Sequence, residues 1–345
     1  MIAKPVDSEG QALRAMPVDS EGQALRAMRA PAKLNLGLRI VGRRADGYHL
    51  LESVFVPLDL EDRLEVRVDP DGSGISLRVD GGSAELADPE RNLAARAARA
   101  FLDAAGLRAS VGIVLEKRIP VGAGLGGGSS DAAALLRVLA TVFPGALGPE
   151  ALRRLALDLG ADVPFFLDPR PARVAGIGER IEPIPGWPEL PVLVVTPARP
   201  LATRAVFEAW DREAAAHPSP ALTPSAPGRN LALPSDPQRI ASPERVLAAA
   251  PVVAPVGAPA GDRELRALLA NDLEAVASRL QPAIGRLRGE IERSGARAVG
   301  MSGSGPSVFG VFRDLRSAEI AAGRGRFEAS DRVHVGRALA SWGVV

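Results

Sequence analysis

Apolar and polar residues alternate strictly over residues 30–38, which is the pattern of a β-strand with one buried face. The leucines at 34, 36 and 38 lie on one face, and Lys33, Asn35 and Gly37 share the other. An ammonium, an amide and a bare stretch of backbone are therefore predicted side by side. Such a face is either the solvent side of an edge strand or part of a functional site.

The same two periodicities predict the other elements of the chain. Strands are predicted at residues 50–60, 63–68, 77–79, 111–115 and 191–196, and on both sides of residues 302–306. Helices are predicted at residues 92–105, 132–142, 150–159, 265–280 and 284–294. Residues 214–261 are rich in alanine and proline, which indicates loops with short helices.

A glycine-rich loop, residues 120–134 with the sequence PVGAGLGGGSSDAAA, follows a predicted strand and opens a predicted helix. Glycines let the backbone adopt positive φ and approach a ligand closely. The first turn of a helix leaves N–H groups unpaired and carries partial positive charge. Together these features indicate a phosphate-binding site rather than a plain tight turn.

Two other phosphate loops fit this stretch less well. A Walker loop requires lysine near its end, and no lysine follows Lys117 in the chain. Gly122, Gly124 and Gly127 match a dinucleotide fingerprint, G-x-G-x-x-G. That fingerprint also requires a second strand ending in an acidic residue about twenty residues later, where this sequence predicts a helix.

Composition narrows the possible functions. The chain has 345 residues, enough for two domains. Its net charge of +1 lacks the positive excess that is typical of nucleic-acid-binding proteins. It has no cysteine, hence no disulfide or thiolate metal site, and only three histidines, which argues against zinc. No apolar run is long enough to span a membrane, so cytoplasm is the expected location. Arginine replaces lysine almost everywhere, so Lys33 and Lys117 become candidates for specific roles.

Other candidates leave alternatives open at this stage. Tyr48 and His49 follow a turn and are suited either to holding a flat base or to ordinary packing. Asp162 lies between a small dipeptide and a predicted apolar strand, as either a turn or cap residue or a base facing a cleft. Lys117, before the glycine loop, is placed to meet phosphate or solvent.

The N-terminus carries a repeat. Residues 5–16 (PVDSEGQALRAM) recur identically as residues 17–28, which indicates a tandem duplication. We expect residues 1–28 to be a disordered leader, with folding from residue 29.

The motifs at residues 30–37, 46–49, 120–133, 160–164, 176–179 and 303–309 resemble, in order and spacing, those of the GHMP small-molecule kinases. The Asp-Gly-Tyr-His segment narrows the likeness to members that phosphorylate a cytidine-diphosphate-linked methylerythritol in the non-mevalonate isoprenoid route. The resemblance implies an α+β fold of two domains with a cleft between them. Residues 29–180 would form a ribosomal protein S5 domain 2-like unit, and residues 181–345 a ferredoxin-like unit.

The resemblance also implies roles for residues. Lys33 and Asp162 would be the catalytic pair. ATP, carrying Mg²⁺ on its phosphates rather than in a protein metal site, would be bound by Asn92, Lys117, Pro120, Val121, Gly122, Ala123, Gly124, Leu125, Gly126, Gly127, Gly128, Ser129 and Ser130. The substrate, a small molecule with a cytidine diphosphate group, would be held by Asn35, Tyr48, His49, Thr203 and Phe207. No nucleic acid or membrane partner is implied, and we expect a monomer or weak homodimer.

Three alternatives stay open. Another GHMP kinase would act on a mevalonate- or homoserine-like substrate, although such a substrate offers no base to Tyr48 and His49. A nicotinamide-dependent oxidoreductase would need the strand and acid that the sequence lacks. A non-catalytic relative would have no need of both Lys33 and Asp162.

Overall fold

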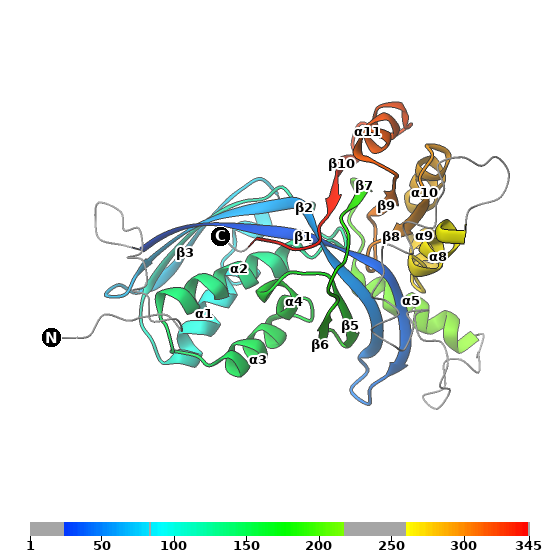
Figure 1. Ribbon diagram of the computed structural model, residues 1–345. Coiled ribbons are helices and arrows are strands. Elements are labelled where there is room, and N and C mark those ends of the chain that lie inside the picture. The colour runs from blue at the N-terminus through cyan, green and yellow to red at the C-terminus, as the bar shows by residue number, and fades with distance from the viewer. Residues whose placement is uncertain (1–23, 83, 217–259, 344–345) are drawn as a thin grey trace.

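The computed structural model describes residues 24–82, 84–216 and 260–343. Two α+β units share a single ten-stranded sheet within these residues (Figure 1). The fold class predicted from the sequence is therefore confirmed.

Two long antiparallel strands, β1 (Ala24–Arg43) and β2 (His49–Asp69), run through both units. On its other edge, β2 pairs in turn with β5 at residues 51–55, with β10 at Leu58, and with β4 at residues 63–69. The two strands predicted at residues 50–60 and 63–68 are thus one strand. The register shifts there, because Ala32 faces Leu58 while Pro31 faces Glu61, so β2 bulges instead of ending.

The N-terminal unit packs helices against one face of its part of the sheet (Figure 1). Its further strands are β3 (Gly74–Asp80), β4 (Ser110–Glu116), β5 (Ala172–Gly176) and β6 (Arg180–Pro183). Its helices are α1 (Leu93–Ala105), α2 (Gly127–Val142), α3 (Pro149–Leu159) and α4 (Val163–Leu167), with a short 3₁₀ helix, η1 (Ala84–Ala87). Because β6 pairs with β5, this unit extends to Pro183, slightly beyond the predicted boundary at residue 180.

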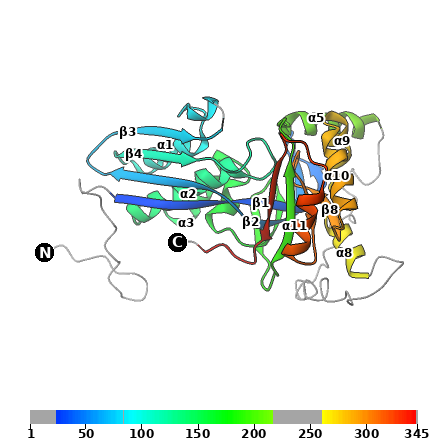
Figure 2. The ribbon, with the colours of Figure 1, turned by 90° about the horizontal axis from the view of Figure 1, so that it is seen from above.

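The C-terminal unit has a ferredoxin-like strand order. Its strands are β7 (Leu190–Thr196), β8 (Ala298–Met301), β9 (Val308–Val311) and β10 (Arg332–Ala338). They lie in the order β10-β7-β9-β8, all antiparallel, and run crosswise to β1 and β2 (Figure 2). The helices are α5 (Thr203–Ala216), α8 (Ala260–Leu268), α9 (Glu274–Leu280), α10 (Ala283–Arg293) and α11 (Leu315–Arg324).

Three apolar cores hold the two units in place. The first lies between the sheet and helices α1 and α2, around Phe101 and Leu135. The second joins the units, because side chains of β1 and β2 pack with those of β7 and β9, including Leu34 and Phe309. The third lies between the C-terminal strands and their helices, around Leu287. The shared middle core fixes the elements that meet at the site described below.

Two local predictions were wrong. The strand expected after Asp162 is the short helix α4, since Pro164 in its first turn needs no N–H partner. The helix predicted at residues 265–280 is broken into α8 and α9 around Asn271. The Asn271 amide donates to the carbonyls of Met301 and Gly303, so a polar cross-link replaces the continuous helix.

The structure also differs from the prediction at the C-terminal end of the leader. Strand β1 begins at Ala24 and pairs with the end of β2, so residues 24–28 are ordered sheet. The remaining leader residues 1–23, and most of the alanine- and proline-rich segment predicted at residues 214–261, lie outside the described residues.

Candidate active site

A cavity of about 520 Å³ lies where the two units meet. Its wall combines the glycine loop with side chains from β1, the turn before α4, and α5. The predicted site residues that line it are Lys33, Asn35, Asn92, Lys117, each residue from Pro120 to Ser129, Asp162, Thr203 and Phe207. Ser130, Tyr48 and His49 do not line it.

The glycine loop has the backbone that a phosphate site requires. Gly122, Gly124 and Gly126 have φ of 64°, 76° and 73°. Helix α2 begins directly after Gly126, no side chain caps it, and its first turn contains no acidic residue. Its first N–H groups are therefore free to bind an anion, and the helix dipole favours negative charge at this point.

The second glycine loop, residues 302–306, supports the first. The Ser302 hydroxyl donates to the Gly124 carbonyl at 2.9 Å, and Ser307 N–H donates to the Ala123 carbonyl at 3.3 Å. A Cβ on Gly124 would lie 2.3 Å from the Ser302 carbonyl oxygen, so only glycine fits this approach. This segment is thus a hairpin between β8 and β9 that also supports the first glycine loop.

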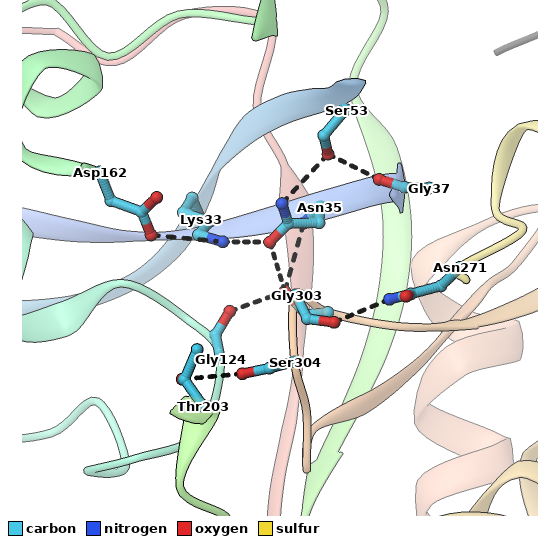
Figure 3. A network of polar contacts seen from close by, with 11 residues as sticks. Lys33, Asn35, Gly37, Ser53, Gly124, Asp162, Thr203, Asn271, Gly303 and Ser304 are labelled. Atoms are coloured by element: carbon cyan, nitrogen blue, oxygen red, sulfur yellow. Dashed lines mark hydrogen bonds and ion pairs between the residues drawn. The ribbon is translucent and has the colours of Figure 1, made fainter. Parts of the chain in front are cut away.

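Lys33 and Asp162 meet at the cavity (Figure 3). Lys33 Nζ lies 3.6 Å from Asp162 Oδ2, with the lysine side chain 4% exposed and the aspartate side chain 33% exposed. Burial lowers the pKa of Lys33, and the Asp162 carboxylate partly offsets this. Asp162 occupies the N-cap position of α4 but makes no capping hydrogen bond, so its carboxylate is free for other chemistry.

Asn35 orders the polar groups beside Lys33 (Figure 3). Its Oδ1 accepts from Lys33 Nζ, and its Nδ2 donates to the Ser53 hydroxyl at 3.1 Å. Ser53 in turn donates to the Gly37 carbonyl at 2.6 Å. Lys33 N–H also donates to the Leu125 carbonyl of the glycine loop at 2.9 Å. The predicted polar face of β1 is thus tied to the loop, and Ser53 is a member that no sequence signal indicated.

An aromatic group from α5 lies at the other end of the site. The His49 ring stacks on Phe207 with centroids 4.8 Å apart, and Trp210 meets it edge-on at 5.6 Å. His49 Nε2 lies 2.7 Å from Asp211 Oδ1. Tyr48 is 62% exposed, whereas His49 is largely enclosed by this group, and contact of either residue with a base stays a prediction. Trp210 and Asp211 were missed because only the fold brings α5 to His49.

Thr203, at the start of α5, connects this helix to the second glycine loop. Its hydroxyl lies 2.9 Å from that of Ser304 (Figure 3). Both residues line the cavity.

Two residues expected on the nucleotide side already have protein partners. Lys117 Nζ is bonded to the buried carboxylates of Asp62 and Asp131. Asn92 caps α1, because its Oδ1 accepts from Ala94 N–H at 2.9 Å and its Nδ2 donates to the Leu86 carbonyl at 2.9 Å. Both still lie on the cavity wall, so contact with a nucleotide there stays a prediction.

Within residues 24–82, 84–216 and 260–343, no group of three or more His, Cys, Asp or Glu side chains is placed to hold a metal ion. In that same part of the chain, no helix combines the length and apolar character needed to cross a membrane.

Comparison with known proteins decides the family. A family model for the GHMP kinases N terminal domain matches residues 92–168, and one for the GHMP kinases C terminal region matches residues 260–329. A 4-diphosphocytidyl-2-C-methyl-D-erythritol kinase from Anaeromyxobacter dehalogenans (strain 2CP-C) is 45% identical over 295 residues, covering 85% of this chain and 82% of that protein. The chain belongs to the 4-diphosphocytidyl-2-C-methyl-D-erythritol kinase family.

Further members of this family agree. A relative with the same name from Granulibacter bethesdensis is 40% identical over 296 residues, which cover 85% of this chain and 87% of the relative. A crystal structure of 4-(cytidine 5'-diphospho)-2C-methyl-D-erythritol kinase has a TM-score of 0.65 and 36% identity, covering 90% of this chain and 98% of that one. The resemblance inferred from the motifs is therefore confirmed.

Proposed function

We propose that this protein transfers a phosphoryl group from ATP to the 2-hydroxyl of 4-diphosphocytidyl-2-C-methyl-D-erythritol, giving the 2-phosphate and ADP in the non-mevalonate route to isoprenoid precursors. The observation that carries the proposal is the Lys33–Asp162 ion pair on the wall of the same cavity as the glycine loop. Family membership supports the choice of substrate, and the geometry of the pair supports the roles proposed for Lys33 and Asp162.

The glycine loop fits the phosphates of a nucleotide. Its positive-φ glycines hold main chain at the cavity surface, and the uncapped start of α2 offers N–H donors there. The residues from Pro120 to Ser130 would therefore bind the triphosphate. When bound, ATP supplies the transferred group, and Mg²⁺ on its phosphates neutralises their charge.

Asp162 is the group best placed to accept a proton from the substrate. Its carboxylate is the exposed member of the pair, whereas the Lys33 ammonium lies behind it, nearly buried. The nearby positive charge favours negative charge on an attacking oxygen. The hydrogen bond from Lys33 to Asn35, backed by Ser53, fixes the position of the ammonium.

The cytosine end of the substrate would be held by the aromatic group. Phe207 lines the cavity, and His49, stacked on it, offers a ring nitrogen for hydrogen bonding. Tyr48 precedes His49 and is exposed, so it would contact the base only at the solvent side. Asn35 and Thr203, both on the cavity wall, would contact the polyol and phosphate portion.

A substrate panel tests this proposal. The purified full-length chain is incubated with ATP, Mg²⁺ and, in turn, the cytidine-linked substrate, the same polyol phosphate without cytidine, mevalonate and homoserine. We expect turnover with the first alone, and phosphorus NMR should place the new phosphate on the 2-position. Comparable turnover of mevalonate or homoserine would replace this proposal with another GHMP kinase activity.

A further inference from the structure

A buried charge cluster lies at the base of the glycine loop. Lys117 Nζ donates to Asp62 Oδ2, and it donates to Asp131 Oδ2 at 2.8 Å. The three side chains are 6%, 0% and 4% exposed, respectively. One ammonium therefore serves two carboxylates almost out of reach of water, an arrangement that is costly unless the groups stay paired.

The three residues sit at the two ends of the loop and on the strand beneath it. Lys117 directly follows β4, and Asp131 lies in the second turn of α2, so their ion pair joins the chain before the loop to the chain after it. Asp62 comes from β2, close to the bulge in that strand. The ion pairs thus connect the two ends of the loop, residues 118–130, to each other and to strand β2.

Asp62 also holds the main chain that enters the loop. Its Oδ1 accepts from Arg118 N–H at 2.6 Å and from Ile119 N–H at 2.9 Å. Lys117 N–H donates to the Asp80 carbonyl at 2.8 Å, so this short segment is fixed from two strands. Both oxygens of Asp62 are then used for holding residues 117–119.

The cluster lies directly against the start of α2. A Cβ on Gly127 would lie 2.9 Å from the Ile119 side chain and 3.2 Å from Lys117 Nζ. A shift of Lys117 or Ile119 would therefore move the first turn of α2, whose N–H groups face the cavity.

We propose that Asp62, Lys117 and Asp131 form a staple that fixes the shape of the phosphate loop, with Asp62 and Asp131 as positioning residues for ATP. The proposal rests on the proposed kinase function. It assigns Lys117 a role in holding the loop, in place of direct pairing with phosphate. Two of the three ammonium donors are committed to carboxylates in the described structure, and the side chain is nearly enclosed.

The sign of one mutational effect separates the staple from simple electrostatics. Asp131 is a carboxylate close to a site for a polyanion, so removing its charge should strengthen ATP binding if charge alone matters, or if Lys117 is freed to pair with phosphate. If the staple matters, removing the acceptor should weaken ATP binding, although a repulsive charge has gone.

The experiment compares Asp131→Leu, which has no acceptor, with Asp131→Asn, which keeps one acceptor oxygen for Lys117 and lacks the charge. In the full-length protein, calorimetry measures the Kd of a non-hydrolysable ATP analogue, and steady-state kinetics measures KM for each substrate. We expect Asp131→Leu to raise the analogue Kd at least tenfold with KM for the second substrate within about threefold. Asp131→Asn should stay within about threefold of wild type on both.

Tighter analogue binding in both variants, or in Asp131→Asn alone if the leucine variant does not fold, would overturn the staple. If a folded Asp131→Leu protein binds both substrates more weakly, with the analogue Kd and the KM of the second substrate raised together, the staple is also overturned. Such a result would indicate general damage to the site. Turnover of the cytidine-linked substrate by wild type is measured in the same series. Its absence would refute the proposed function, while the effect on analogue binding would still decide the staple.

Discussion

Lys33 Nζ lies 3.6 Å from Asp162 Oδ2, although the lysine comes from a strand and the aspartate from a turn far along the chain. The pair is asymmetric, because the ammonium is enclosed and the carboxylate is a third exposed. The carboxylate is the more accessible of the two charged groups, which fits the proposed roles of Asp162 as the base and Lys33 as the charge that supports it.

The first prediction concerns the pKa of Lys33. Burial lowers this pKa and Asp162 raises it, so Asp162→Asn should lower it further. The chain has only three lysines, so NMR titration of labelled lysine side chains resolves Lys33 readily. We expect its midpoint below the usual lysine range in wild type and lower still in the variant.

Lys117 provides the internal control for this titration, because its two carboxylates raise its pKa above the ordinary value despite burial. A Lys33 midpoint that is the same in both proteins, beside a raised Lys117, would show that the ion pair does not form in solution.

The second prediction concerns Gly124. Alanine there would place Cβ 2.3 Å from the Ser302 carbonyl oxygen and 2.9 Å from that of Gly305, at a φ of +76°. We expect Gly124→Ala to raise the KM for ATP more than tenfold, because either the loop or its support must move.

Gly145 supplies a matched control. It has a φ of +79°, and its Cβ would meet nothing within 4 Å. Gly145→Ala should therefore cost only the strain of a left-handed residue, about 1–2 kcal/mol of stability, and leave the KM for ATP unchanged. Equal kinetic effects in the two variants would mean that contact between the two glycine loops is unimportant.

The third prediction concerns Phe207. Its ring lines the cavity and stacks on His49. Phe207→Leu should raise the KM for the cytidine-linked substrate about tenfold, since stacking on a base contributes about 1–3 kcal/mol. The KM for ATP should not change.

Phe327→Leu is a suitable control, because Phe327 packs against the core of the C-terminal helices. A similar rise in both variants would assign the Phe207 effect to stability and leave the cytosine site without support.

The fourth prediction concerns pH. Burial raises the pKa of Asp131 to about 7, from an ordinary value of about 3.8. Between these values the folded protein holds a proton that the unfolded chain has lost, so this group makes stability fall as pH rises. The groups that face it are Lys117 and Asp62.

Asp131→Asn removes this contribution. The free energy of unfolding of wild type relative to the variant should therefore decrease between pH 4 and pH 7, measured by denaturant titration. A difference that increases over this range would mean that Asp131 is ionised in the folded protein throughout.

Sequence patterns predicted the features that depend on neighbouring residues. The alternation around Lys33 identified the polar face of β1, and the glycine run identified the loop and the start of α2. The family motifs then implied that Asp162 and Lys33 act as a pair, whereas spacing alone left Asp162 open between a turn or cap residue and a base.

Features that depend on distant contacts were not predictable in this way. Asp62 looked like a break between two strands, and only the folded protein shows its hydrogen bonds to Arg118 and Ile119. No sequence pattern connects Asp211 with His49, because only the fold brings α5 to that ring. The helix break at Asn271 likewise depends on hydrogen bonds to the carbonyls of Met301 and Gly303, which lie about thirty residues away and cannot be inferred from the neighbouring sequence.

The most direct test of the account is a single-turnover measurement on Asp162→Asn with ATP, Mg²⁺ and the cytidine-linked substrate. The account predicts that the rate of phosphoryl transfer falls by about 10²–10⁴, the usual cost of losing a well-placed base, with ATP affinity nearly unchanged. Transfer at close to the wild-type rate would contradict it.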